Sequence, residues 1–164
     1  MVVAAMNYRL APEHPFPAGL NDVVSTVKWI AENGDNLGIN ADKFALGRDS
    51  AGANLAFAAV LVLKDSTKPI EEEEGGGREE SNLVGALYLL YGPYSPELLS
   101  RESMKLFGQG EYGLTYAQME WAINQTFQNQ SDYSNPLAFP LLADNLTGHS
   151  PCLYCCYGFG PSKG

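Results

Sequence analysis

Ser50 is the residue of this sequence whose surroundings best suit a nucleophile. It lies in the run Phe44-Ala-Leu-Gly-Arg-Asp-Ser-Ala-Gly-Ala-Asn-Leu55, between an apolar segment that predicts a strand and one that predicts a helix. A serine on such a turn lifts its Oγ above the sheet, and small neighbours let helix and strand approach closely. The backbone N–H of Ala51 would then point to where an oxyanion forms, aided by the helix dipole. A serine that merely caps the helix is the alternative, and this run alone does not decide between the two.

The elements that must position Ser50 alternate along the chain. Apolar runs predict strands over residues 2–8, 43–47, 83–91 and 152–157. Helical spacing predicts helices from residue 20 to a C-cap at Gly34, over 51–64, and over 115–127. In the last helix Thr115 is the expected N-cap, and Met119, Ala122, Ile123 and Phe127 are expected to face inward. This alternation predicts an α/β fold with right-handed crossovers and a mainly parallel sheet.

Two motifs of the sequence resemble motifs of one known family and occur along the chain in the same order as in that family. The run Tyr8-Arg-Leu-Ala-Pro-Glu-His-Pro-Phe-Pro-Ala18, followed by Asp22, resembles the signature that precedes the nucleophile in the hormone-sensitive-lipase-like α/β hydrolases. The run Asp49-Ser-Ala-Gly-Ala-Asn-Leu55 resembles that family's nucleophile motif, and residues 135–143 and 151–161 resemble the segment that leads into its catalytic acid. The resemblance covers nearly the whole chain. It implies a partial α/β-hydrolase domain over residues 1–164, in which a three-layer αβα sandwich with a mainly parallel sheet is incomplete.

The resemblance also implies an activity and the residues that carry it. The expected protein is a carboxylesterase that cleaves small or medium acyl esters through an acyl-serine, without cofactor or metal. Ser50 matches the nucleophile and Ala51 a backbone oxyanion donor. The residues that match supporting positions of the motifs are Asp49, Gly52, Tyr8, Arg9 and Glu13.

The sequence departs from the family pattern at four places. Arg48 stands where the family has a glycine, and its side chain is expected to cost about 1–3 kcal/mol or to displace the serine. Gly160 stands where the catalytic acid would be. The family's His-Gly-Gly-Gly oxyanion loop is expected before Met1, and its catalytic histidine after Gly164. We therefore expect impaired activity in this chain, and the alternative is a pseudoenzyme or a small-ligand-binding relative with the same fold.

The two histidines of the chain are poor substitutes for the missing base. His14 lies in the proline-rich turn of the first motif, which favours a structural role. His149 and Asp144 precede the last strand, so we expect them at its entry end, whereas active sites lie at the carboxyl ends of parallel strands. Asp49 is expected to orient the turn and not to act as a base.

Composition limits the remaining roles. The net charge of −9 includes −5 from residues 70–80, where six glutamates meet one arginine, and residues 71–80 are expected to be a disordered acidic loop. Nucleic acid is an unsuitable partner because no basic stripe exists. No apolar stretch reaches the length of a membrane span. We expect a cytoplasmic protein with a small-molecule ester substrate, and an oligomer is compatible with the sequence.

Residues 93–130 are expected to form a helical excursion resembling a lid or cap. An aromatic-rich stretch begins just before it and offers two interpretations, the lining of an acyl pocket or lid, or ordinary packing, which is favoured. Its members are Tyr88, Tyr91, Tyr94, Phe107, Tyr112 and Tyr116.

Overall fold

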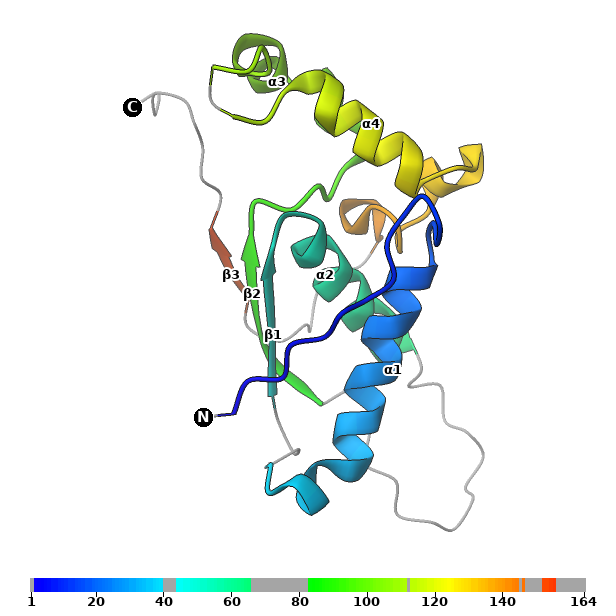
Figure 1. Cartoon of the computed structure of the whole chain (residues 1–164), viewed down its shortest axis with the longest axis vertical. Helices are drawn as coiled ribbons and strands as arrows, with labels where there is room; N and C mark the ends of the chain where they lie inside the picture. Colours follow the sequence, from blue (N-terminus) through cyan, green and yellow to red (C-terminus); the bar gives the residue numbers. More distant parts are fainter. Residues whose placement is uncertain are drawn as a thin grey trace.

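A parallel sheet of three strands lies at the centre of the molecule. The computed structural model describes residues 2–39, 44–65, 83–111, 113–144 and 146, and the backbone of residues 152–155. The strands are β1 (Phe44–Asp49), β2 (Val84–Leu90) and β3 (Cys152–Cys155), in the order β1-β2-β3. Both pairings are parallel, so the carboxyl ends of all three strands share one edge, the upper one in Figure 1. The predicted parallel α/β sheet is confirmed.

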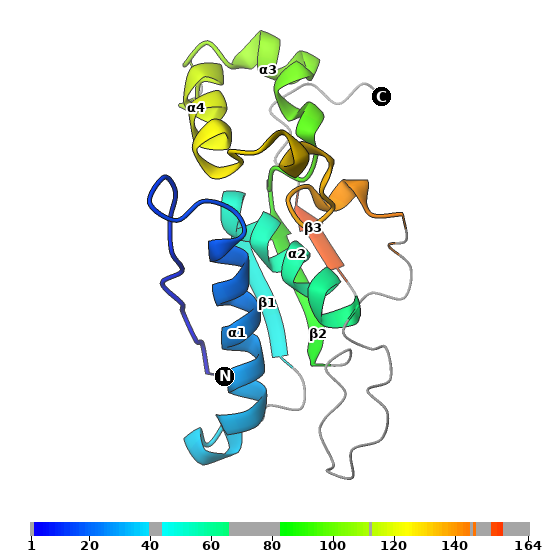
Figure 2. The ribbon, with the colours of Figure 1, turned by 90° about the vertical axis from the view of Figure 1, so that its right-hand side faces the viewer.

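The helices lie on one face of this sheet and above its carboxyl edge. The α-helices are α1 (Ala18–Asn33), α2 (Ser50–Asp65), α3 (Glu102–Phe107) and α4 (Tyr116–Thr126). Short 3₁₀ helices are η1 (Gly34–Leu37), η3 (Pro96–Ser100), η4 (Gln130–Ser134) and η5 (Pro140–Leu142). Helices α1 and α2 cover one face, and α3 and α4 lie beyond the carboxyl ends of the strands (Figures 1 and 2).

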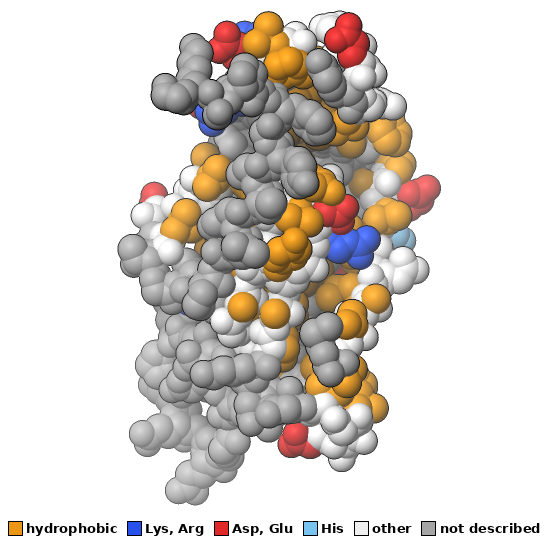
Figure 3. Space-filling view, turned by 90° about the vertical axis from the view of Figure 1, so that its left-hand side faces the viewer, with side chains coloured by type: hydrophobic (Ala, Val, Ile, Leu, Met, Phe, Trp, Pro, Cys, Tyr) orange, Lys and Arg blue, Asp and Glu red, His pale blue; other side chains and the backbone are white. Residues whose placement is uncertain are grey.

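The other face of the sheet carries no helix among the described residues. Tyr88 on β2 points to that side and is 47% exposed. Viewed from the left of Figure 1, the molecule presents several hydrophobic side chains at its surface (Figure 3). The described residues thus supply two of the three expected layers, which agrees with an incomplete fold.

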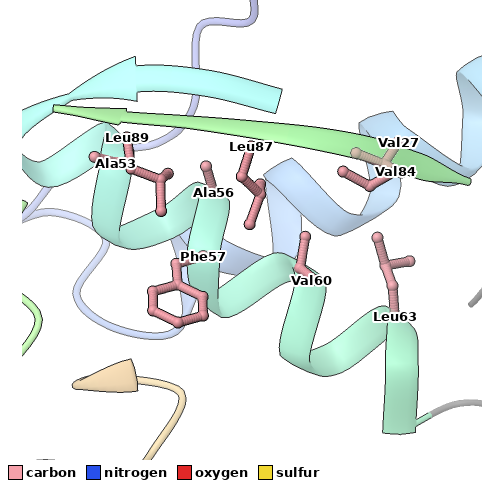
Figure 4. Close-up of a cluster of buried hydrophobic side chains, with 9 residues drawn as sticks. All are labelled: Val27, Ala53, Ala56, Phe57, Val60, Leu63, Val84, Leu87 and Leu89. Carbon is pink, nitrogen blue, oxygen red and sulfur yellow. The ribbon is translucent and has the colours of Figure 1, made fainter. Parts of the chain in front are cut away.

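Helix α2 holds the main core together. Its apolar side chains pack against β1 and β2 on one side and against α1 on the other, so it is hydrophobic nearly all round. Figure 4 shows the cluster between α2 and the sheet, which comprises Val27, Ala53, Ala56, Phe57, Val60, Leu63, Val84, Leu87 and Leu89. Burial of each large side chain stabilises the fold by about 1.5–3 kcal/mol. The first turn of α2 is therefore fixed against the carboxyl edge of the sheet.

A second, aromatic core attaches α4 to the N-terminal segment. The rings of Phe127 and Phe139 lie 4.7 Å apart, and those of Phe16 and Phe127 lie 5.7 Å apart. The backbone N–H of Phe16 donates to the carbonyl of Thr126 over 2.9 Å. Thr115 caps α4 in a capping box with Gln118, as predicted. These contacts fix both ends of α4.

Two sequence-based expectations about the elements are wrong. Residues 2–8 are not a strand, because they pair with no strand of the sheet and strand structure needs a hydrogen-bonded neighbour. An apolar groove of about 520 Å³ separates them from β1. Strand β1 continues two residues past the predicted end, through Arg48 and Asp49, because pairing with β2 outweighs their low strand propensity. Ala122, expected to face inward, is exposed and lies on the side of α4 that lines the pocket described below.

Several expectations fall on residues that the structure does not describe. The acidic run 71–80, Tyr112, His149 and Gly160 belong to this group. In the described ranges no helix is long and apolar enough to cross a membrane, and no cluster of three side chains suited to a metal ion occurs. The cytoplasmic location stays a prediction.

Candidate active site

Ser50 lies on an abrupt turn between β1 and α2. Strand β1 ends at Asp49 and α2 begins at Ser50, with no residue between them. Ser50 has a φ of 49°, a left-handed conformation that is uncommon for residues other than glycine and is often found at functional sites. The residue is exposed at the carboxyl edge of the sheet and at the N-terminus of α2. The strand-to-helix turn expected from the sequence is present.

Arg48 is accommodated beside this turn because Gly52 has no side chain. A Cβ atom placed on Gly52 would overlap Cγ of Arg48, so the stem of the arginine occupies the space of the missing methyl group. Arg48 lies on the helix-covered face of the sheet, since its pairing partner Leu89 is buried against α2. Ser50 stays on the turn beside Arg48, so of the two expected outcomes displacement of the serine does not occur. The expected energetic cost stays a prediction.

The Asp49 side chain contacts Arg48 and Tyr91 at the carboxyl edge of the sheet. Its Oδ1 lies 3.5 Å from Nε of Arg48, and its Oδ2 accepts a 3.3 Å hydrogen bond from the hydroxyl of Tyr91. Burial, and then the neighbouring Asp49 carboxylate, raise the pKa of Tyr91. Tyr91 follows β2 with a φ of 38°, a second left-handed residue at the same edge. Asp49 thus links the ends of β1 and β2, in keeping with a structural role.

The first motif forms a clamp between the N-terminal segment and α1. The guanidinium of Arg9 donates to both carboxylate oxygens of Asp22, with Nη2 2.7 Å from Oδ1, and the backbone N–H of Arg9 donates to Oδ2. Side-chain hydrogen bonds from Arg9, with the backbone bond second, lower the pKa of Asp22 to about 2. Glu13 is exposed in the following turn and does not line the pocket described next. The clamp positions the loop that carries Tyr8 and His14.

A pocket of about 200 Å³ lies beside Ser50. Its walls come from four places, namely residues 8–20, the first turns of α2, Pro93 and the inner face of α4. Ser50, Ala51, Tyr8 and Arg9 all line it, and so does His14. The pocket therefore brings together a strained, exposed serine and the helix N-terminus that follows it.

Asn54 fixes one wall of this pocket. It is 5% exposed, and its Nδ2 donates to the carbonyls of Pro93 and Ala138 over 2.7 and 2.9 Å. Asn54 and Pro93 both line the pocket. One amide group therefore joins α2 to two segments that lie far from it in sequence.

The structure separates the predicted site residues into two groups. Ser50, Ala51, Tyr8 and Arg9 meet at the pocket, whereas Arg48, Asp49, Gly52 and Glu13 do not line it. Gly160 and His149 lie outside the described residues, and Asp144 is exposed away from the pocket lining.

The described members of the aromatic stretch do not line this pocket, and their interpretation as part of an acyl pocket or lid stays a prediction. Tyr94 instead packs edge-on against the Phe57 ring, with centroids 5.9 Å apart. The sequence reasoning missed the roles of Asn54, Leu10 and Phe16. It did find the spacing of Met119, Ala122, Ile123 and Phe127, but interpreted it as packing alone.

Comparison with known proteins identifies this architecture. The family model described as "alpha/beta hydrolase fold" matches residues 1–163. The chain belongs to the α/β-hydrolase fold family. The resemblance to the hormone-sensitive-lipase-like group is also confirmed.

Two curated relatives match this hydrolase chain over almost its whole length. Carboxylic ester hydrolase LipN of Mycobacterium tuberculosis is 34% identical over 98% of the chain, which spans 40% of that protein. AB hydrolase superfamily protein C1039.03 of Schizosaccharomyces pombe is 35% identical over 96% of the chain, which spans 44% of that protein. A solved structure, the hyperthermophilic esterase from Pyrobaculum calidifontis, superposes with a TM-score of 0.77 at 32% identity, covering 90% of this chain and 43% of its own. The chain spans less than half the length of these three relatives.

Proposed function

We propose that this chain carries the nucleophile of a serine hydrolase that cleaves small or medium carboxylic esters through an acyl-serine. The observation that carries the proposal is the conformation of Ser50, an exposed serine with positive φ that joins β1 to α2 and lines an apolar pocket. A serine that only caps a helix has no need of this strained backbone, because N-cap residues adopt extended φ and ψ. The esterase names of its relatives support the same reaction.

The proposed reaction has two steps at Ser50. The Oγ attacks the ester carbonyl carbon, its proton passes to a base, and the bond to the alcohol oxygen breaks so that the alcohol leaves with a proton. Water then attacks the acyl-serine, the acid is released, and Oγ regains its proton. The resemblance assigns the base to a histidine beyond the described residues, and His14 is the one imidazole that the described residues place at this pocket.

The N-terminus of α2 supplies the electrostatic part of the mechanism. The backbone N–H of Ala51 belongs to the first turn of the helix, where the N–H groups have no intrahelical partner. A donor there stabilises the negative oxygen of the tetrahedral intermediate, and loss of one such donor costs about 10²–10³ in kcat in other enzymes. We also propose that residues 93–130 act as a cap, since α4 forms one wall of the pocket.

The reactivity of Ser50 is tested with a fluorophosphonate probe on the 164-residue chain, followed by peptide mapping. We expect label on the peptide that contains Ser50 and none in Ser50→Ala. Ser25→Ala is the matched control, because Ser25 is an exposed serine on α1 outside the pocket. Its labelling should equal that of the wild type.

Two results would contradict the proposal. One is a wild-type chain that is folded by circular dichroism yet takes no label at Ser50, which favours a pseudoenzyme. The other is equal labelling of wild type and Ser50→Ala. A His14→Gln variant tests the imidazole at the pocket, since unchanged labelling excludes His14 from proton transfer.

A further inference from the structure

We propose that the pocket beside Ser50 receives an aryl or short alkyl substituent of the ester, up to about the size of a benzene ring, and that Ala122 sets this limit. This inference rests on the proposed function for the ester itself. The pocket and its size limit can be tested without any turnover.

The pocket walls favour an uncharged, apolar group. Leu10 and Phe16 contribute from one side, Leu55 from α2, and Met119 and Ile123 from α4. Removing such a group from water is favourable, whereas a charged group would lose its hydration without gaining a partner.

Two polar side chains of the lining, those of Arg9 and Asn54, are engaged elsewhere. Arg9 is the lining residue with a permanent positive charge, and its guanidinium is bound to both oxygens of Asp22. Nδ2 of Asn54 donates to two backbone carbonyls. These engagements leave the Arg9 guanidinium and the Asn54 amide nitrogen occupied, and most of the remaining lining is apolar, so selection in the pocket rests mainly on shape and apolar contact.

The size of the pocket sets the class of substituent. A volume of about 200 Å³ slightly exceeds the engineered cavity of about 150 Å³ that binds benzene in another protein. Binding sites for drug-sized ligands are larger, at about 300–1,000 Å³. A phenyl or short alkyl group therefore fits beside Ser50, and a long acyl chain would have to leave the pocket.

Ala122 is a small residue of the α4 wall, at a position where a larger side chain would fill part of the pocket. Met119, Ile123 and Thr126 line the pocket around it, and the Ala122 methyl group itself is exposed to the opening. A larger side chain at 122 would project into the free volume. Because Phe127 is anchored between Phe16 and Phe139, α4 cannot easily move away to compensate.

The test measures binding of acetophenone, which keeps the carbonyl and ring of an aryl ester but cannot be hydrolysed. It is titrated by NMR into the 164-residue chain and into Ala122→Phe. We expect Ala122→Phe to weaken the affinity by about tenfold or more, equivalent to about 1.4 kcal/mol. Ala117→Phe is the matched control, since Ala117 is exposed on the same helix and does not line the pocket. It should bind acetophenone as the wild type does, and 2-tridecanone should bind the wild type no more tightly than acetophenone.

The outcomes separate this inference from the proposed function. Absence of acetophenone binding to the folded wild type, equal affinity in Ala122→Phe, or an equal loss in Ala117→Phe would each refute the pocket assignment. Tighter binding of 2-tridecanone would refute the size limit. If Ala122-dependent binding is seen while the fluorophosphonate fails to label Ser50, the pocket stands and the hydrolase proposal falls. If Ser50 is labelled while Ala122→Phe binds acetophenone as tightly as the wild type, the hydrolase proposal stands and the pocket assignment falls.

Discussion

Replacement of Asn54 by alanine is expected to destabilise the fold by about 1.5–4.5 kcal/mol. The change removes both hydrogen bonds of Nδ2 and leaves the carbonyl of Ala138, a fully buried residue, without this donor. A buried acceptor that loses its partner costs about 1–3 kcal/mol, and the half-buried carbonyl of Pro93 adds about 0.5–1.5 kcal/mol. Since domains are stable by only about 5–15 kcal/mol, the loss is a large share of the total.

Urea unfolding followed by circular dichroism and tryptophan fluorescence measures this loss. Asn33→Ala is the control, because Asn33 also donates through Nδ2, to the carbonyl of Trp29, but in an exposed position near the end of α1. Its effect should stay within about 0.5 kcal/mol. If Asn54→Ala shifts the unfolding free energy no more than Asn33→Ala, then the two bonds do not hold the segments together and the reasoning is refuted.

Three further changes test other contacts. Gly52→Ala should destabilise the chain by about 1–3 kcal/mol through overlap with Arg48, and should become neutral or mildly stabilising in an Arg48→Gly background, as a double-mutant cycle of unfolding free energies would reveal. Asp22 has a folded pKa of about 2, below its unfolded value near 4, so its contribution to stability is present above pH 4 and lost as the pH falls toward 2. The stability gap between the wild type and Asp22→Asn should therefore shrink over that interval, and a gap that is constant with pH would contradict the role of Arg9. Thr115→Ala should cost about 0.5–2 kcal/mol by removing the cap of α4, and an unchanged melting temperature would argue against it.

Strands and helices could be predicted from the sequence where the spacing of apolar residues matches the face that the fold buries. Apolar runs located the strands that become β1 and β2, and helical spacing located α1, α2 and α4 with its Thr115 cap. Residues 2–8 have the same apolar character, but a strand also requires a paired neighbour, and the pattern of a single segment does not reveal one.

At the site, sequence reasoning located the turn but not the pocket. Ser50 was predictable because small residues mark the close approach of strand and helix. Asn54 was not, since its partners lie 39 and 84 residues away and are backbone carbonyls, which carry no side-chain signature. The compatibility of Arg48 with the turn depended on empty space above Gly52, which three-dimensional packing alone reveals.

The two sides of the pocket differ in how freely they can change. The side formed by Asn54 shares its hydrogen bonds with the folded core, so a substitution there alters stability and shape together. The face of α4 is anchored through Phe127, its cap and the packing of Met119, which leaves Ala122 free to vary. Substitutions on this face of α4 would change the shape of the pocket without changing Ser50 or the core that supports it. Under the proposed function, homologues could therefore differ in ester selectivity through this one helix face.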